Sequence, residues 1–308
     1  MAALKKRPTS TILGLAAALV LAASPPPAAG QQDFSQVEIQ AHAAGAGVWM
    51  LAGAGGNIGV SAGADGVFLI DDQYAPLTER IRTAVAAIDP GPIRFVLNTH
   101  WHGDHTGGNE NLGKAGTLIV AHENVRERMS VEQLMARFDR TVPPSPKAAL
   151  PVVTYTDAVT FHWNGDEIHA FHVPPAHTDG DSIVHFRNAN VLHMGDIYFA
   201  GGYPFVDLGS GGSARGVLGA VERALELADA ETRVIPGHGP LSDRSGLAAY
   251  AEMLRAVVGL VEALVGQGKS LEEVQAAKPS AAHDETWGGG WIGPDDFVAT
   301  IYQSLTGE

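Results

Sequence analysis

The sequence predicts a mixed α/β (α+β) fold, and three observations support this. Short apolar runs separated by glycines fill residues 37–71, a pattern typical of an antiparallel meander. Apolar residues recur at helical spacing in residues 76–88, 214–228 and 245–265. Hairpin signals occur between the first of these helical segments and the other two. Because no interdomain linker is found, residues 31–308 are expected to form a single domain with one large core or two coupled halves.

The first half of the chain is expected to consist mainly of short strands. The expected strands are 37–39, 48–51, 58–60, 67–70, 93–97 and 117–121, and the expected helices are 76–88 and 123–138. Pro76 lies near the first turn of the earlier helix, and Asp89-Pro90-Gly91-Pro92 ends it. Residues 141–150 contain three prolines and are expected to form a loop or a crossover.

The second half combines two hairpins with several helices. Asn164-Gly165 lies between two apolar runs and is a strong signal for a tight hairpin turn. Pro294 is well placed to start the last helix. The expected strands are 158–163, 167–173, 182–186, 190–194 and 233–235, and the expected helices are 214–228, 245–265, 271–277 and 295–305.

Residues 1–30 have the composition of a secretory signal peptide. Lys5, Lys6 and Arg7 are basic, residues 12–23 form an uncharged apolar run, and small residues follow for cleavage. The alternative is a membrane anchor, but this run falls short of the ~20 residues that span a bilayer. We therefore expect a periplasmic or secreted protein without a stable membrane anchor. The chain contains no cysteine, so disulfides cannot stabilise it.

The formal net charge of the chain is −14. This acidity argues against nucleic acid or an anionic membrane as a partner. We expect a small-molecule substrate, and the sequence does not indicate an oligomeric state.

The strongest functional signal is the stretch from Asn98 to Gly108. It places His100, His102, Asp104 and His105 directly after an apolar run that is typical of a buried strand. Imidazole and carboxylate groups suit zinc, iron or manganese, and the neighbouring glycines permit the sharp turn that convergence requires. The alternative is a polar loop whose histidines only cap the strand, which would require neither the glycines nor the strand.

Three later stretches supply the ligands that this loop lacks, since a dinuclear site needs about six or seven protein groups. His177 lies on a turn after two prolines, and Asp196 ends an apolar strand. His238 lies between two glycines at the end of another strand.

These motifs, in this order, resemble the metallo-β-lactamase superfamily over roughly residues 48–250. The resemblance implies a four-layer αβ/βα sandwich of two similar halves, with two Zn²⁺ ions at one edge. It implies that His100, His102 and His177 hold the first metal, that Asp104, His105 and His238 hold the second, and that Asp196 bridges both. Asp71 matches a position that supports the metal loop from behind.

Within the superfamily, the details resemble two kinds of site. His105 with a bridging Asp196 is similar to the glyoxalase II type. Residues 207–212 resemble the stretch after the metal-binding cysteine of one zinc β-lactamase subclass. This chain lacks that cysteine, and near residues 197–199 it lacks the lysine that those enzymes use to hold a substrate carboxylate. Both departures count against efficient β-lactam hydrolysis.

We expect a metal-dependent hydrolase in which a metal-bound hydroxide attacks a carbonyl and Asp104 orients the nucleophile. The expected export favours a β-lactam or another cyclic amide. A lactonase or a broad-specificity ester or thioester hydrolase is the main alternative. A di-iron oxygen-reducing protein is an alternative of a different class. It would usually have a carboxylate at the position of His102 and an added flavin module, and neither is present in this sequence. A non-catalytic metal-dependent binding protein is the remaining alternative.

The sequence contains several other residues that could lie at or near the site. The eight further histidines are expected to lie on the surface or in strands, and strand alternation predicts that His193 points away from Asp196. Trp49 and Tyr198 are candidates either for substrate contact or for ordinary packing. Trp101 lies between two predicted ligands and is expected to brace the loop.

Overall fold

The computed structural model describes residues 33–307, and its strands form two large sheets and one hairpin. The predicted signal peptide lies outside the described residues. The first sheet has the order β1 (Gln40–Gly45), β2 (Val48–Ala52), β3 (Ile58–Ser61), β4 (Val67–Ile70), β5 (Ile93–Asn98), β6 (Leu118–His122) and β9 (Val153–Tyr155). The second has the order β10 (Ala158–Trp163), β11 (Asp166–His172), β12 (Ser182–Phe186), β13 (Val191–His193), β14 (Arg233–Ile235) and β15 (Ser242–Asp243). The hairpin pairs β7 (Gln133–Met135) with β8 (Arg140–Val142).

Helices connect and follow these strands. The α-helices are α1 (Thr78–Ile88), α2 (Gly103–Thr106), α3 (Asn109–Lys114), α4 (Glu123–Ser130), α5 (Ala214–Leu227), α6 (Arg244–Gly266), α7 (Leu271–Ala276), α8 (Asp284–Trp287) and α9 (Pro294–Thr306). Short 3₁₀ turns are η1 (Ala75–Leu77), η2 (Ala136–Phe138), η3 (Lys147–Ala149), η4 (Gly195–Ile197) and η5 (Leu208–Ser210). Within residues 33–307 no helix has the length and apolar character needed to cross a membrane.

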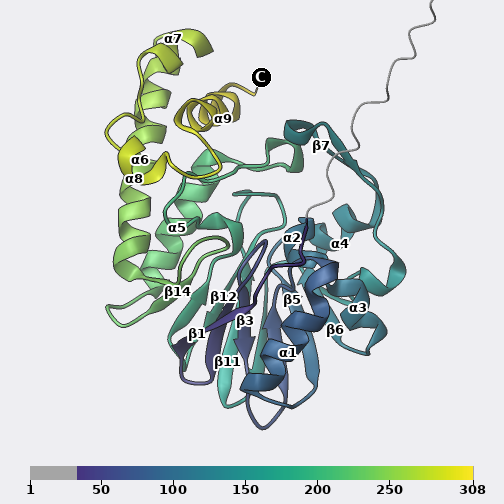
Figure 1. The fold of residues 1–308 in the computed structure, drawn as a ribbon. Coiled ribbons are helices and arrows are strands. Elements are labelled where there is room, and N and C mark those ends of the chain that lie inside the picture. Colours follow the sequence, from purple (N-terminus) through teal and green to yellow (C-terminus); the bar gives the residue numbers. More distant parts are fainter. Residues whose placement is uncertain (1–32, 308) are drawn as a thin grey trace, which may run out of the picture. The chain divides into compact units, whose positions relative to one another are not determined.

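The two sheets pack face to face, with helices on their outer faces (Figure 1). Strand alternation produces this arrangement, because successive side chains point to opposite faces. In β4, Phe68 and Ile70 join the core between the sheets, whereas Val67 and Leu69 join the core beneath α1. The outer face of the second sheet is covered by α5, α6 and α9. These four layers confirm the predicted αβ/βα sandwich.

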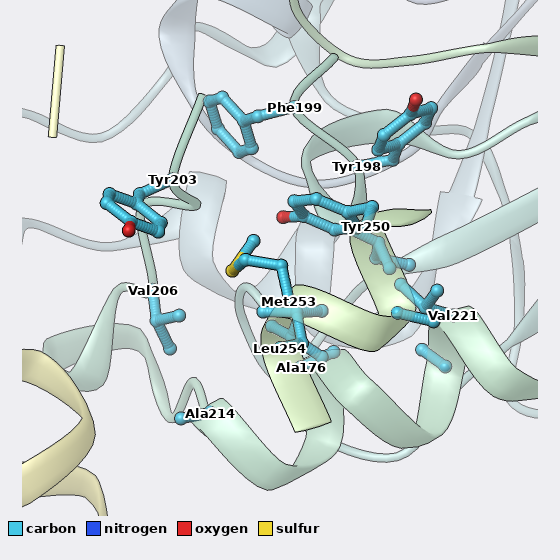
Figure 2. Packing of buried hydrophobic residues seen from close by; sticks show 14 of the residues in the cluster. Ala176, Tyr198, Phe199, Tyr203, Val206, Ala214, Val221, Tyr250, Met253 and Leu254 are labelled. Atoms are coloured by element: carbon cyan, nitrogen blue, oxygen red, sulfur yellow. The ribbon is translucent and has the colours of Figure 1, made fainter. Parts of the chain in front are cut away.

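The core beneath α5 and α6 reaches the loop that follows β13. Figure 2 shows Tyr250 and Met253 of α6 close to Tyr198 and Phe199. The rings of Tyr198 and Tyr250 are 4.9 Å apart, and the Tyr198 hydroxyl hydrogen-bonds to Ser242. Large buried aromatic rings therefore fix the backbone next to Asp196.

Most predicted elements are confirmed. The turn at Asn164-Gly165 joins β10 to β11 with φ values of 53° and 75°, the left-handed conformation that a two-residue hairpin needs. Pro294 occupies the first turn of α9, as predicted.

Two element predictions are wrong. The expected strand at 37–39 is not formed, and β1 begins at Gln40 instead. The helix expected over 123–138 stops at Ser130, and the β7–β8 hairpin follows. Only Val125 and Met129 of that helix are buried, and the next positions on the same face, Glu132 and Gln133, are polar, so the buried face does not continue.

Candidate metal centre

The candidate site lies where four strands end. Asp71 directly follows β4, and the stretch from Thr99 to His105 follows β5, which runs parallel to β4. Asp196 follows β13 and His238 follows β14, which also run parallel. Carboxyl ends of parallel strands meet at one edge of a sheet. The two sheets therefore bring these residues, far apart in the sequence, to a common edge.

All seven predicted ligand residues come together in two clusters. Four residues form the first cluster, His100, His102, His177 and Asp196, and three form the second, Asp104, His105 and His238. Within each cluster, one nitrogen or oxygen atom per residue lies within 4.8 Å of all the others. Each cluster therefore has a donor set and a size that could hold a metal ion.

Asp196 joins the two clusters. Its Oδ2 atom lies 3.9 Å from His100 Nε2 and 3.7 Å from His177 Nε2 on one side. On the other side, Oδ2 lies 3.3 Å from His238 Nε2, and Oδ1 lies 3.0 Å from His105 Nε2. The carboxylate is thus within reach of both clusters, as the bridging role requires.

Each of three histidine rings is held by its second nitrogen. His102 Nε2 is paired with Asp207 Oδ2 at 3.0 Å, which turns Nδ1 towards His177. His177 Nδ1 donates to the Phe205 carbonyl at 2.7 Å, and His105 Nδ1 is paired with Asp71 Oδ2 at 2.8 Å. Partners of this kind fix the tautomer and orientation of metal-binding histidines.

Asp71 supports the metal loop, as its sequence position suggested. It is fully buried and accepts hydrogen bonds from the Thr99 backbone at 2.8 Å and the Thr99 hydroxyl at 2.7 Å. Its φ of 64° lies in the left-handed region, where Asp is tolerated better than most residues. One carboxylate therefore fixes both the start of the loop and the ring of His105.

The site contains buried polar atoms without hydrogen bonds. His100 Nε2, His105 Nε2 and Asp196 Oδ1 are all buried, and none has the geometry of a hydrogen bond to a partner among the described residues, although His105 Nε2 and Asp196 Oδ1 lie 3.0 Å apart. Leaving such atoms unsatisfied is costly, so native structures rarely do so without a reason. Because all three point into the two clusters, metal ions there would satisfy them, and the donor set fits the ions that the family implies.

The first cluster favours neutral imidazoles. Burial lowers the pKa of His100 well below its usual value and that of His177 to about 4. Burial opposes ionisation of Asp196, but the surrounding histidines hold its pKa well below the usual value. Neutral imidazoles and an ionised carboxylate are the forms that bind metal ions.

Carboxylates in and around the second cluster raise the pKa values of its two histidines. Burial lowers the pKa of His238, but Asp196 and Asp104 outweigh it and raise that pKa to about 9. In the same way, Asp196, Asp104 and Asp71 overcome burial and raise the pKa of His105. His105 and His238 hold the pKa of Asp104 at about 2 despite its burial. This concentration of negative charge attracts cations, and a divalent ion would compete with those protons.

Solvent reaches the site from the second cluster. The side chains of Asp104 and His238 are 22% and 31% exposed, whereas those of His100, His105 and His177 are at most 1% exposed. On the buried side, Gly56 packs so closely on His105 that a Cβ atom there would overlap the ring. A substrate would therefore approach along the side of Asp104 and His238.

The other sequence candidates lie outside the two clusters. His193 is buried, its Nε2 is paired with the Asn57 carbonyl, and it belongs to neither cluster. Trp101 braces the loop, because its indole nitrogen donates to Ser210. Tyr198 is a packing residue, and Trp49 packs with the core beneath α1.

Sequence reasoning missed two residues that shape the site. Asp207 holds His102, and the sequence places it only within the stretch 207–212 that resembles one zinc β-lactamase subclass, with no local signal for this pairing. Asn57 joins the two halves, because its backbone donates to Gly237 and its side chain donates to Pro236 and Gly239. Its place after a glycine-rich turn was the only sequence signal.

Comparisons with known proteins agree with this geometry. The sequence model of the metallo-beta-lactamase superfamily matches residues 53–238. The hydroxyacylglutathione hydrolase of Methylococcus capsulatus is 30% identical over 224 residues, which cover 65% of this chain and 77% of that protein. The enzyme of the same name from Rhodospirillum rubrum is 28% identical over 188 residues, covering 56% of this chain and 64% of that protein.

Solved structures share the fold. A metallo-beta-lactamase from Pontibacter korlensis has a TM-score of 0.57 at 21% identity, covering 71% of this chain and 99% of that chain. The sec-alkylsulfatase Pisa1 from Pseudomonas sp. has a TM-score of 0.65 at 17% identity, covering 85% of this chain and 49% of that chain. At this identity the likeness concerns the fold alone. The match to the family model decides the assignment: the chain belongs to the metallo-beta-lactamase superfamily and is a metal-dependent hydrolase.

Proposed function

We propose that the protein is a dinuclear zinc hydrolase that cleaves acyl bonds of small molecules. One observation carries this proposal: Asp196 lies between two histidine-rich clusters and reaches both, at 3.7–3.9 Å on one side and 3.0–3.3 Å on the other. In the proposal, His100, His102 and His177 hold the first ion, Asp104, His105 and His238 hold the second, and Asp196 bridges them. Zinc suits these donors, and iron or manganese would accept the same set.

The chain's own residues position the reaction. When bound, two zinc ions would acidify water and polarise a carbonyl oxygen. Asp104 is ionised and partly exposed, so its carboxylate can accept a hydrogen bond from the attacking water and orient it. Asp71 and Asp207 keep His105 and His102 in position during turnover.

Esters and thioesters are the first substrate class in this proposal. The ligand set contains Asp196 where the cysteine-containing β-lactamases have their cysteine, and the relatives reported above are named hydroxyacylglutathione hydrolases. Lactones fall in the same class because they are cyclic esters. Because the chain belongs to a family of metal-dependent hydrolases, we favour an enzyme over a binding protein that holds metal without catalysis.

Cyclic amides, including β-lactams, are the second class. They are supported by the signal-like composition of residues 1–30, which would place the enzyme in the periplasm or outside the cell. Export stays part of the proposal, and sequencing the N-terminus of the mature protein tests it. A start near residue 30 is the expected result, and retention of Met1 in an exported preparation would contradict cleavage.

The test of the function is a substrate panel assayed on protein of known metal content. The panel contains a thioester, a simple ester, a lactone and a chromogenic β-lactam. We expect turnover of at least one acyl substrate that a chelator abolishes and zinc restores. Activity that survives complete removal of metal would contradict the proposal, as would a fully zinc-loaded enzyme that hydrolyses no member of the panel.

A further inference from the structure

Three aromatic rings form a continuous surface beside the first cluster. We call Phe138, Phe205 and Trp291 the aromatic wall. The rings of Phe138 and Trp291 stack at 5.5 Å with an angle of 8°, and each also packs against Phe205, at 5.7 Å and 5.4 Å respectively. Each ring thus touches the other two, as aromatic side chains do when they form a single apolar surface.

The wall is assembled from three distant segments. Phe138 belongs to η2 in the β7–β8 hairpin, Phe205 precedes η5, and Trp291 precedes α9. Trp291 also lies beyond residue 238, where the match to the family model ends. Of the three rings, Trp291 therefore lies outside the region that matches the family model, whereas Phe138 and Phe205 lie inside it.

The inner ring of the wall lies directly on the first cluster. Phe205 stacks at 6.0 Å on His102 and packs at 5.6 Å against His177, and its carbonyl accepts the hydrogen bond from His177 Nδ1. Phe205 therefore connects the two other rings of the wall to the first cluster.

The outer rings remain open to solvent. Phe205 is 8% exposed, whereas Phe138 is 40% and Trp291 is 60% exposed. Among the described residues, Phe138 and Trp291 are the two large aromatic side chains that are exposed. Exposed apolar surface next to a reaction centre is stabilised when an apolar ligand covers it.

The wall is also fastened in place. The Arg137 guanidinium lies 5.9 Å from the Trp291 ring centre and pairs with Asp296 of α9 at 3.0 Å. This contact ties the β7–β8 hairpin to the segment that carries Trp291. Because the three rings are already held together, a ligand would lose little free energy in ordering them.

We propose that the aromatic wall binds an aromatic or extended apolar substituent of the acyl substrate while its scissile carbonyl lies at the two clusters. This inference rests on the proposed function and specifies its substrate class. Phe138 and Trp291 are specificity-determining residues in this proposal, because they touch the substrate away from the reacting bond.

The kinetic test compares esters that differ in one ring. Ethyl phenylacetate, benzyl acetate and ethyl acetate are assayed with the zinc-loaded wild type and with Trp291→Ala, Trp291→Phe and Phe138→Ala. The wild type should prefer at least one aromatic ester. Trp291→Ala should lower kcat/KM for that ester about tenfold, equivalent to about 1.4 kcal/mol, mainly through KM. Ethyl acetate should change less than about twofold, and Trp291→Phe should restore most of the preference.

Leu260→Ala is the matched control, because Leu260 is 52% exposed on α6 and lies outside the wall. It should leave every ester unchanged. A wild type without aromatic preference would overturn the proposal. So would a Trp291→Ala variant in which all three esters decline in parallel, because that pattern indicates a structural role.

A binding measurement separates this proposal from the proposed function. The unactivated amide N-benzylphenylacetamide is titrated calorimetrically into wild type and Trp291→Ala of known metal content. If no panel substrate is hydrolysed, the proposed function is wrong. The aromatic wall is still supported in that case if the wild type binds the amide and Trp291→Ala binds it more weakly. Equal binding by both proteins, or none by the wild type, overturns it.

Sedimentation of both proteins provides the last check. If the wild type is a dimer, and Trp291→Ala dissociates it without changing the selectivity between esters, the wall is a contact between copies of the chain and the proposal is wrong.

Discussion

Carboxylates that face histidines determine the geometry of the site at the scale of single residues. Asp71 holds His105 at 2.8 Å, Asp207 holds His102 at 3.0 Å, and Asp196 lies between the clusters. Each of the two supporting pairs fixes one ring nitrogen and turns the other towards a cluster, where it could bind a metal ion. The two supporting carboxylates serve different clusters, so their effects can be separated by experiment.

Replacing Asp71 by Asn should weaken metal binding at the second cluster by about 10–100-fold. Asn tolerates the left-handed φ of 64° at this position, so the backbone should be preserved. Asp207→Asn is the matched change at the first cluster. Titration against a chromophoric chelator should show one weakened site in each variant. If both metal sites keep the wild-type affinity in one of these variants, the replaced carboxylate does not orient a metal-binding histidine.

Replacing Asp104 by Asn should leave some metal bound, because the first cluster is unchanged, while reducing turnover by about 10²–10⁴-fold. The amide keeps the shape of the side chain but cannot accept the water proton as a carboxylate does. Asp157→Asn is the control, because Asp157 is exposed and lies outside both clusters. The measurement is kcat with metal content determined on the same samples. An unimpaired Asp104→Asn enzyme would rule out the assigned role.

Local sequence reveals some of these residues and not others. His100 to His105 are adjacent, and His177, Asp196 and His238 each follow a recognisable strand or turn, so their residue types indicate ligands. Asp207 and His102 are 105 residues apart. Only the folded chain brings that pair together, and the same holds for the aromatic wall.

At the scale of elements, the start of α5 supports the turn that carries His177. Gly216 lies so close to the Pro175 carbonyl that a Cβ atom there would overlap it. The Ser213 backbone, at the start of the same helix, donates to the Ala176 carbonyl at 2.7 Å. The helix and the turn therefore pack backbone to backbone, and the position of His177 depends on this contact.

Gly216→Ala should destabilise the protein by about 1–3 kcal/mol and weaken metal binding at the first cluster, because the turn must move. Gly219→Ala is a control on the same helix, where a Cβ atom would meet nothing within 4 Å. That change should be neutral or stabilising by up to about 1 kcal/mol. Thermal unfolding and metal titration test both variants. Equal behaviour of the two would show that the close contact is unimportant.

Element boundaries were predictable where turn chemistry is explicit. Asn164-Gly165 and Pro294 are strong local signals, and both elements form as expected. The predicted helix over 123–138 is longer than the observed α4, because the charged residues after Ser130 resemble the exposed face of a helix. The β7–β8 hairpin has no Asn-Gly signal and turns at Asp139, whose φ is 45°. Its existence depends on contacts with distant segments, which include Phe205 and Trp291.

At the scale of the whole molecule, the site lies where the two sheets meet. Asn57 links the first half to the strand end that carries His238, and the clusters draw residues from both halves. Strand and helix periodicity predicted the α/β class, whereas the resemblance to a family supplied the four layers. A metal centre at this junction would couple metal binding to the stability of the fold.

Removing metal should therefore lower the thermal unfolding midpoint. A bound ion contributes about 2.7 kcal/mol when its free concentration is 100 times its dissociation constant. Differential scanning calorimetry with and without chelator measures the shift, and added zinc should reverse it. An unchanged midpoint after complete removal of metal would contradict coupling between the clusters and the fold.

In the proposed function, two metal ions at the joined clusters are required for hydrolysis. The most direct measurement is a titration of the metal-free protein with zinc, in which bound metal and turnover of the best panel substrate are followed together. Turnover should rise to a plateau at about two zinc ions per chain. Full turnover before any metal binds would contradict it, as would two bound ions with no turnover of any acyl substrate.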